Sequence, residues 1–127
     1  MNTKTARISE YDDIIDSRRV LSVIEELRAK KEAYPKSFKG DEELTALETL
    51  SSEAEEFCED WRDGAILIRN THFTEYVRDL LHECGDIPKE LPHYVRIDWE
   101  ATAREMMADY TKIYFGDSVY WGRCAND

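Results

Sequence analysis

The stretch from Ile97 to Trp121, IDWEATAREMMADYTKIYFGDSVYW, predicts a helix that is followed directly by a β-hairpin. Asp98 can cap the helix, and apolar residues recur through it at helical spacing. After the helix the period changes to two residues, as in a strand. Gly116 falls in the turn, where it can adopt the positive φ that a short hairpin requires. A two-stranded ribbon alone is marginal in water, so its apolar side chains are expected to pack on the helix: Ile113, Phe115 and Trp121.

These residues resemble a known family. The helix start Ile-Asp-Trp-Glu-Ala, an aromatic strand, a Gly-Asp turn and a final Val-Tyr-Trp are similar to the C-terminal domain of ArdA-type antirestriction proteins. The resemblance covers the last half of the chain and transfers Ile97 to Glu100 and Tyr110 to Trp121 as structural positions only. ArdA-type proteins are acidic, elongated DNA mimics that act as dimers. The resemblance therefore implies inhibition of a DNA-targeting enzyme and identifies no catalytic site.

The wider layout resembles a group of phage and prophage proteins with the same kind of ending. These proteins open with a Glu-Tyr-Asp-Asp-x-Ile-Asp-Ser segment, which is present here as Glu10 to Ser17. An acidic helical hairpin occupies the middle, and Ile68-Arg69 and Phe73-Thr74-Glu75-Tyr76 follow it. This resemblance implies a phage-type protein that acts against a defence system of its bacterial host.

The formal net charge of −11 is concentrated in one segment. Residues 41–63 hold ten acids and one base, a balance of −9. Residues 1–40 hold seven acids and nine bases, and residues 64–127 hold eleven acids and seven bases. Affinity for phosphates comes largely from clustered Lys and Arg, so direct binding of nucleic acid is disfavoured. A partner with a basic surface is favoured instead, such as a host defence nuclease or another DNA-binding complex.

Composition also predicts the compartment. No apolar run approaches the roughly 18 residues that span a membrane, and the N-terminal residues lack the apolar segment of a signal peptide. Three cysteines without framework spacing indicate a reducing compartment. The predicted location is the host bacterial cytoplasm.

Two helices joined by a short break are predicted in the first half. Asp16 or Ser17 can cap a helix that ends near Glu32, and a second helix is predicted over residues 41–63. The second helix has a heptad stripe that the first can cover, which favours an antiparallel helical hairpin. The stripe consists of Leu44, Leu47, Ser51, Ala54, Cys58 and Trp61, thickened by Leu50 and Phe57.

In the second half, Ala65 to Ile68 is interpreted as a buried strand or extended link, although its length leaves a helix open. A third helix is predicted from Asn70 or Thr71 to Gly85. The predicted fold class is therefore α+β and mainly helical. Residues 1–63 would form an N-terminal segment and the acidic helical hairpin, and residues 64–127 a small ArdA-like module of two helices and a β-hairpin.

Motifs for catalysis or cofactor binding are missing from the sequence. There is no GxGxxG, GxxxxGK[ST], GxSxG, HExxH or CxxC pair. His72, His82 and His93 could converge on a metal with Cys84, but His82 and Cys84 point to different faces of one helix. Cys58 and Cys84 occupy apolar helix positions, which predicts burial. A non-enzymatic protein without metal or cofactor is therefore predicted.

The acidic second helix is the most informative feature. Its 23 residues would span about 35 Å, which gives about one carboxylate per 3.5 Å, close to the one phosphate per 3.4 Å of a DNA strand. Like charges in a row destabilise a helix, and selection for solubility alone would intersperse lysines. DNA mimicry is one interpretation, and a solvated helix face is the other. The predicted partner-binding acids are Glu42, Glu53, Glu56, Glu59, Asp60 and Asp63.

The C-terminal half contains more aromatic residues than a small module can bury. Tyr114 and Tyr120 alternate away from Phe115 and Trp121, so they are predicted on the outer face, at a homodimer or partner surface. The leading hypothesis is a counter-defence protein that inhibits a restriction enzyme or a CRISPR effector by acidic DNA mimicry. The alternative is a helical-hairpin adaptor or scaffold that oligomerises with itself or with another helical protein.

Overall fold

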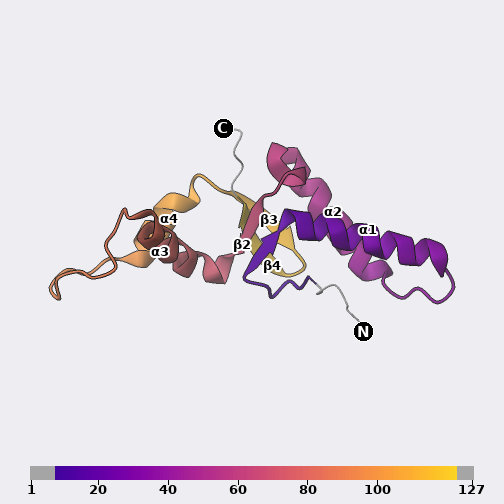
Figure 1. Cartoon of the computed structure of the whole chain (residues 1–127), viewed down its shortest axis with the longest axis horizontal. Coiled ribbons are helices and arrows are strands. Elements are labelled where there is room, and N and C mark those ends of the chain that lie inside the picture. Colours follow the sequence, from indigo (N-terminus) through magenta and orange to yellow (C-terminus); the bar gives the residue numbers. More distant parts are fainter. Residues whose placement is uncertain (1–7, 123–127) are drawn as a thin grey trace.

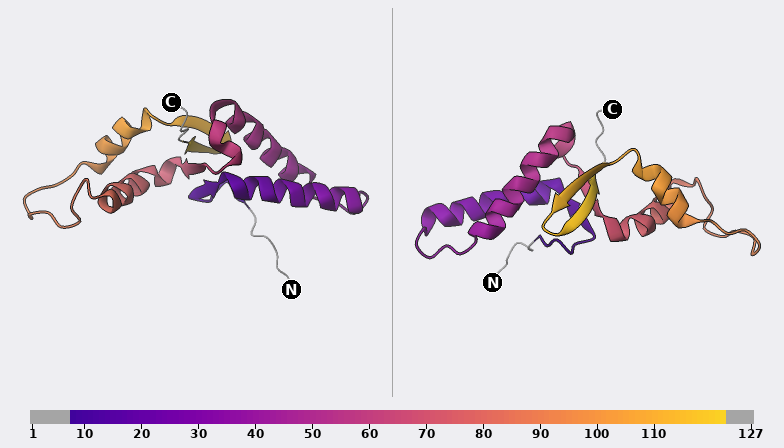
Figure 2. Two further views of the ribbon diagram at one scale, coloured as in Figure 1. Left: turned by 45° about the horizontal axis from the view of Figure 1, so that its top comes forward. Right: turned by 180° about the vertical axis from the view of Figure 1, so that it is seen from behind.

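The computed structural model describes residues 8–122. Its elements are, in chain order, β1 (Ile14–Asp16), α1 (Ser17–Ala33), α2 (Asp41–Phe57), the 3₁₀ helix η1 (Glu59–Arg62), β2 (Ile66–Arg69), the 3₁₀ helix η2 (Asn70–His72), α3 (Phe73–Cys84), α4 (Trp99–Met107), β3 (Thr111–Phe115) and β4 (Ser118–Gly122). The molecule is elongated: the sheet lies in the middle, with α1 and α2 on one side and α3 and α4 on the other (Figures 1 and 2). The predicted α+β, mainly helical class is confirmed.

The strands form a four-stranded sheet in the order β1-β2-β4-β3, and all neighbours are antiparallel. Because side chains alternate across a strand, the register sorts the apolar residues onto two faces. Leu67 shares one face with Ile113 and Tyr120, since Ile113 pairs with Tyr120, and Leu67 pairs with the residue two positions beyond Tyr120. Ile68 and Trp121 pair on the opposite face. Each face therefore has its own hydrophobic cluster.

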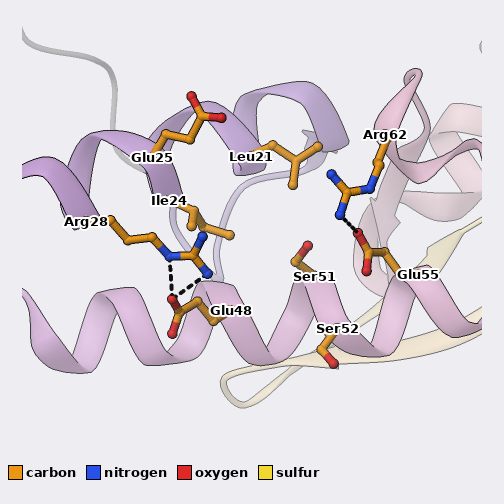
Figure 3. Close-up of a pocket in the computed structure, with 9 residues that line it drawn as sticks. All are labelled: Leu21, Ile24, Glu25, Arg28, Glu48, Ser51, Ser52, Glu55 and Arg62. Atoms are coloured by element: carbon orange, nitrogen blue, oxygen red, sulfur yellow. Dashed lines mark hydrogen bonds and ion pairs between the residues drawn. The ribbon is translucent and has the colours of Figure 1, made fainter.

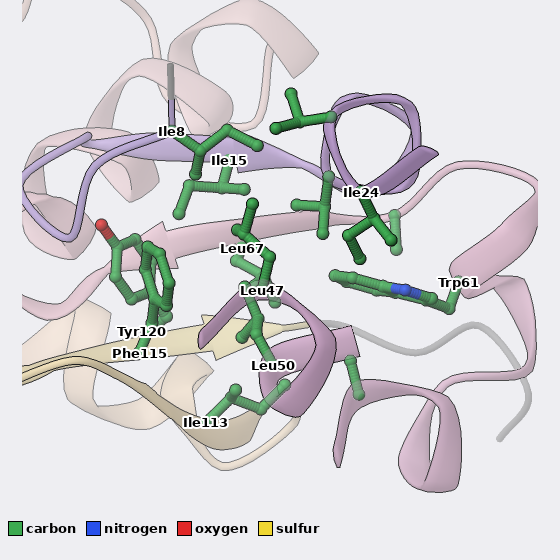
Figure 4. Close-up of a cluster of buried hydrophobic side chains, with 14 of the residues drawn as sticks. Ile8, Ile15, Ile24, Leu47, Leu50, Trp61, Leu67, Ile113, Phe115 and Tyr120 are labelled. Carbon is green, nitrogen blue, oxygen red and sulfur yellow. The ribbon is translucent and has the colours of Figure 1, made fainter. Parts of the chain in front are cut away.

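The first cluster fills the space between one face of the sheet and α1, α2 and η1 (Figure 4). Val20 of α1, Leu47 of α2 and Trp61 of η1 are fully buried in it. Helices α1 and α2 pack against each other, so the predicted helical hairpin is confirmed. The predicted stripe of α2 is buried as well, except for Phe57, whose side chain is 51% exposed.

The second cluster joins the opposite face of the sheet to α3 and α4. Only Ile68, Phe73, Val77 and Ala103 are buried in it. Phe73 meets Tyr110 edge-on, with the ring centroids 5.0 Å apart. The larger apolar side chains around these residues are only partly buried: Ile66, Tyr76, Leu81, Met106, Met107, Tyr110 and Trp121.

Three local signals in the second half act as predicted. Gly85 has a φ of +82° and ends α3 in the left-handed conformation. The Asp98 carboxylate accepts a hydrogen bond from the backbone N–H of Ala101 and so caps α4. Gly116 has a φ of +61° in the turn between β3 and β4. Strand β2 confirms the strand interpretation of the segment that follows Gly64.

Tyr120 contradicts its prediction as an outward-facing residue. It is fully buried, and its hydroxyl donates to the backbone carbonyl of Asp12 at 2.6 Å. Burial, together with the nearby Asp12 carboxylate, raises the pKa of Tyr120 to about 12. The predicted alternation was wrong for β4 alone: Tyr120 pairs with Ile113 and therefore lies on the same face of the sheet as Ile113 and Phe115, whereas Trp121 lies on the opposite face. Tyr114 is 57% exposed, in agreement with the prediction.

Two further details differ from the predictions made from the sequence. Strand β1 was not predicted; it pairs with β2 and forms one edge of the sheet. The prediction that Ile113 and Phe115 pack on the preceding helix is wrong, because they pack with the first cluster, whereas Trp121 packs with the second cluster beside α4, as predicted. A domain boundary after residue 63 stays a prediction, although the first cluster contains residues from both sides of it. No helix within residues 8–122 is both long and apolar enough to cross a membrane.

Candidate functional site

Five acidic residues lie in the last two turns of α2, in η1 and directly after η1, and we call this set the acidic corner. It consists of Glu53, Glu56, Glu59, Asp60 and Asp63. Four of them are exposed, and Asp60 is half-buried. Glu42, the sixth predicted residue, lies near the other end of α2, about 16 Å from Glu53 along the axis at 1.5 Å per residue. The acids are therefore concentrated at one end of the helix.

The single helix predicted over residues 41–63 is wrong. Helix α2 ends at Phe57, because Cys58 has an extended backbone with φ −126° and ψ 104°. In the next turn, the indole N–H of Trp61 donates to the Ser51 hydroxyl at 2.9 Å. In a continuous helix these two residues would be about 15 Å apart along the axis. Burial of Trp61 against α2 therefore requires the chain to turn back, and no uniform acidic rod is formed.

Two side-chain contacts and one glycine hold the turn that carries the acidic corner in place. Trp61 is fully buried beneath it and bonded to Ser51. Arg62 reaches back to Glu55 of α2, with a nitrogen–oxygen distance of 3.2 Å. Gly64, with a φ of +127°, then redirects the chain into β2. An exposed ion pair contributes little stability, so the buried indole is the main anchor.

Other carboxylates of α2 are already paired. Glu48 accepts two hydrogen bonds from Arg28 of α1, and Glu55 pairs with Arg62 (Figure 3). At the start of α2, Asp41 accepts from Lys31 at 2.9 Å, which raises the pKa of that lysine. By contrast, within residues 8–122 the acids of the corner and Glu42 form no ion pair. Their charges are available to a partner.

The location of the acidic corner opposes the dipole of α2. The C-terminal end of a helix carries partial negative charge, and each acid there costs about 0.3–1 kcal/mol. The last turn of α2 has no basic residue and contains Glu55 and Glu56. Arg62 offsets Glu55, whereas Glu56 remains unpaired. Folding alone does not explain this arrangement, which instead favours a role in binding.

The groove between α1 and α2 contains a cavity of about 280 Å³ that is bordered by the two ion pairs of Figure 3. Ser51 lines it, but the Ser51 hydroxyl accepts the Trp61 indole and lies beside no histidine. The lining also includes Leu21, Ile24 and Glu25. Among the described residues these groups form no nucleophile–base arrangement, so the cavity does not indicate a reaction.

The residues considered for metal binding lie on different elements. His72 is in η2, His82 is in α3, and His93 is in the loop between α3 and α4. In the described part of the chain, no three His, Cys, Asp or Glu residues are grouped to hold a metal ion. Cys58 is buried, but Cys84 is exposed, so the prediction of burial is wrong for Cys84. Cys84 follows Leu80 and Leu81 past the point where the second cluster covers α3.

A family model described as "Antirestriction protein (ArdA)" matches residues 2–120. The chain belongs to the ArdA antirestriction family. The match extends over nearly the whole chain, so the helical hairpin and the acidic corner belong to the family domain, as does the C-terminal half. No curated protein and no solved structure matches significantly.

Membership of the ArdA family gives a functional class that the geometry alone does not. The family description implies inhibition of restriction systems, and therefore interaction with restriction–modification enzymes. ArdA antirestriction proteins are typically inhibitors without enzymatic activity.

Proposed function

We propose that this protein is a phage-type counter-defence inhibitor whose acidic corner occupies the DNA-binding cleft of a host restriction enzyme. The observation that carries the proposal is the group of exposed, unpaired carboxylates on a turn anchored by Trp61. A rigid mount reduces the entropy that is lost when the acids meet their partner. Family membership supports restriction enzymes as the first target class, and a CRISPR effector with a similar cleft is the second.

Mimicry of DNA phosphates has a specific electrostatic consequence. Carboxylates that meet a lysine- and arginine-lined cleft accelerate association, and this effect weakens steeply as salt screens the charges. The inhibitor should therefore compete with DNA, and its apparent affinity should fall as the salt concentration rises. Glu42 lies outside the acidic corner and is proposed as a secondary contact of the same kind.

The decisive test compares two variants with the same change in net charge. The corner variant carries Glu53→Gln, Glu56→Gln, Asp60→Asn and Asp63→Asn. The control variant carries four neutral substitutions at exposed acids of α3, α4 and their connecting loop: Glu83→Gln, Glu90→Gln, Glu100→Gln and Glu105→Gln. Inhibition of DNA cleavage by purified restriction enzymes should weaken by about tenfold or more in the corner variant, since each lost charge pair weakens binding.

The control variant should inhibit nearly as well as the parent protein. Circular dichroism and thermal unfolding of both variants establish that the fold is intact. An equal loss in the two variants would show that only total charge matters, and full inhibition by the corner variant would exclude this surface. Either result would end the proposal.

The adaptor hypothesis receives no support from the position of the hydrophobic stripe. Leu44 and Leu47, which would form the seam with another helix, are buried in the protein's own core at 5% and 0% exposure. Tyr114 remains proposed as an aromatic contact for a partner or a second copy, since it is exposed on β3 and Lys112 lies 5.9 Å from its ring centroid.

A further inference from the structure

Phe57, the last residue of α2, is the aromatic residue that lies within the acidic corner. Its side chain is 51% exposed, and it belongs to neither of the two hydrophobic clusters. Trp61 fills the core beneath this end of the helix instead, where its indole is bonded to Ser51. The Phe57 ring is therefore not needed to complete the core, and aromatic side chains are enriched at protein interfaces.

Unpaired carboxylates lie on both sides of Phe57. Glu53 precedes it by four positions in α2, and residues at this spacing have Cβ atoms about 5–6 Å apart. Glu56 precedes Phe57 directly, and Glu59 follows two positions later. All three acids are exposed and form no ion pair within residues 8–122. The exposed ring therefore lies among negative charges.

The protein itself places no cation on this ring. At Tyr11, another exposed aromatic residue, Arg69 lies 5.3 Å from the ring centroid. In the described range 8–122, neither a cation nor a second ring stacks on Phe57. Arg62, the base nearest to it in sequence, pairs with Glu55 instead. The ring of Phe57 is therefore accessible to a cation of a partner.

This combination of groups suits a guanidinium better than an ammonium. The planar guanidinium of an arginine can stack on an aromatic ring while its N–H groups donate to a neighbouring carboxylate. The ammonium of a lysine is more strongly hydrated and lacks the planar fork that makes both contacts at once. A DNA-binding cleft, the surface that the proposed function assigns to the partner, carries both kinds of base.

We propose that Phe57 binds an arginine side chain of the partner's DNA-binding cleft, with the guanidinium stacked on the ring and bonded to Glu53. This inference rests on the proposed function and names the partner group that the acidic corner recognises. Carboxylates alone attract either base, whereas the ring makes the corner selective for arginine.

A peptide titration tests the preference for arginine without any enzyme. The full chain is labelled with nitrogen-15 and titrated at low salt with hexa-arginine and, separately, with hexalysine. Amide resonances of residues 53–63 should shift with both peptides, and hexa-arginine should bind more tightly. In Phe57→Leu, which keeps an apolar side chain but has no ring, the ratio of the two affinities should fall by about twofold to fivefold, because the cation–π contact is lost.

Two control variants separate the ring from a general effect on the fold. Phe57→Tyr keeps an aromatic ring and should retain the preference for hexa-arginine. Tyr34→Leu removes a 67% exposed ring at the opposite end of the α1–α2 hairpin and should retain it as well. Thermal unfolding of each variant establishes that the structure is intact.

The cleavage assay then tests the contact in the cleft itself. Phe57→Leu should weaken inhibition by about fivefold or more, because a cation–π contact is stronger where water is excluded. The dependence of inhibition on salt should stay as in the parent protein, since this substitution changes no charge. Phe57→Tyr should inhibit as the parent protein does.

Three results would overturn the inference. One is the absence of shifts at residues 53–63 with both peptides, and another is the same preference for hexa-arginine in the parent protein and in Phe57→Leu. The third is full inhibition by Phe57→Leu where the corner variant fails, which would leave the proposed function standing without the ring. Full inhibition by the corner variant would instead end the proposed function, and the peptide titration would still decide whether the ring selects arginine.

Discussion

The two faces of the sheet support regions of unequal packing. The cluster under α1, α2 and η1 contains sixteen buried hydrophobic residues, whereas the cluster under α3 and α4 contains four. Burial of apolar surface is the main source of stability, so the first region should resist opening far better than the second. The larger buried apolar surface of the first region offsets the cost of the unpaired acids at the C-terminal end of α2. The acidic corner therefore lies on the more stable of the two regions.

The largest expected effect separates two tryptophans. Trp61→Ala should lower the free energy of unfolding by about 3–5 kcal/mol, because it empties the core and leaves the Ser51 hydroxyl without its donor. Trp99→Ala in α4 should have a smaller effect, about 1–2 kcal/mol, since Trp99 is only partly buried. Urea unfolding followed by circular dichroism measures both. A larger loss of stability for Trp99→Ala than for Trp61→Ala would show that the second region, and not the first, contributes more to the stability of the protein.

A smaller effect is expected for the tyrosine that ties the N-terminal segment to the first region. Tyr120→Phe should cost about 0.5–1.5 kcal/mol at neutral pH, because it removes the hydrogen bond to the partly buried Asp12 carbonyl. Since the pKa of Tyr120 is raised from 10.0 to about 12, its contribution is fully present below pH 10 and is lost as the pH rises toward 12.

Chemical denaturation at neutral pH and above pH 10 tests this dependence. The gap between the parent protein and Tyr120→Phe should narrow at alkaline pH. A gap that is constant across the range would show that the hydroxyl does not titrate between the folded and unfolded states as described. Tyr114→Phe, at an exposed side chain, is the control and should leave the free energy of unfolding unchanged both at neutral pH and above pH 10.

The smallest expected effect is a gain in stability at the acidic corner. Glu53→Gln with Glu56→Gln should raise the free energy of unfolding by about 0.3–1 kcal/mol, because two like charges leave the negative end of the α2 dipole. The substitutions Glu90→Gln, in the loop between α3 and α4, and Asp117→Asn, in the turn between β3 and β4, lie at no helix end and should change the free energy of unfolding less. Thermal unfolding at low salt gives the comparison. A loss of stability at the corner would mean that these acids contribute to folding.

Local features of the fold followed from short segments of sequence. Asp98, Gly85 and Gly116 each act through a few neighbouring backbone groups, so their roles as cap, helix end and turn could be predicted. The stripe of α2 was also predictable, because helical periodicity repeats over many residues. Strand β1 could not be predicted, because its three residues carry little periodic signal and its partner β2 lies about 50 positions later in the chain.

The role of the acidic corner in binding stays a prediction. The residue types and their concentration could be read from the sequence, since five of the six predicted acids fall within residues 53–63. The break at Cys58 could not be read, because no glycine or proline marks it. It depends on the Trp61 hydrogen bond with Ser51, a contact made only once the chain has folded. The face of the sheet on which Tyr120 lies could not be predicted either, because it depends on the pairing of β3 with β4 in the folded protein.

The sequence alone determined the helices, the hairpin turn, the local excess of acid and the family, because each depends on nearby residues or on their order. Tertiary structure alone decided which acids stay unpaired, where α2 stops, and which tyrosine is buried. Those outcomes depend on contacts between distant segments, such as Arg28 with Glu48 and Tyr120 with Asp12, whose formation requires the sheet and both helices to be in place.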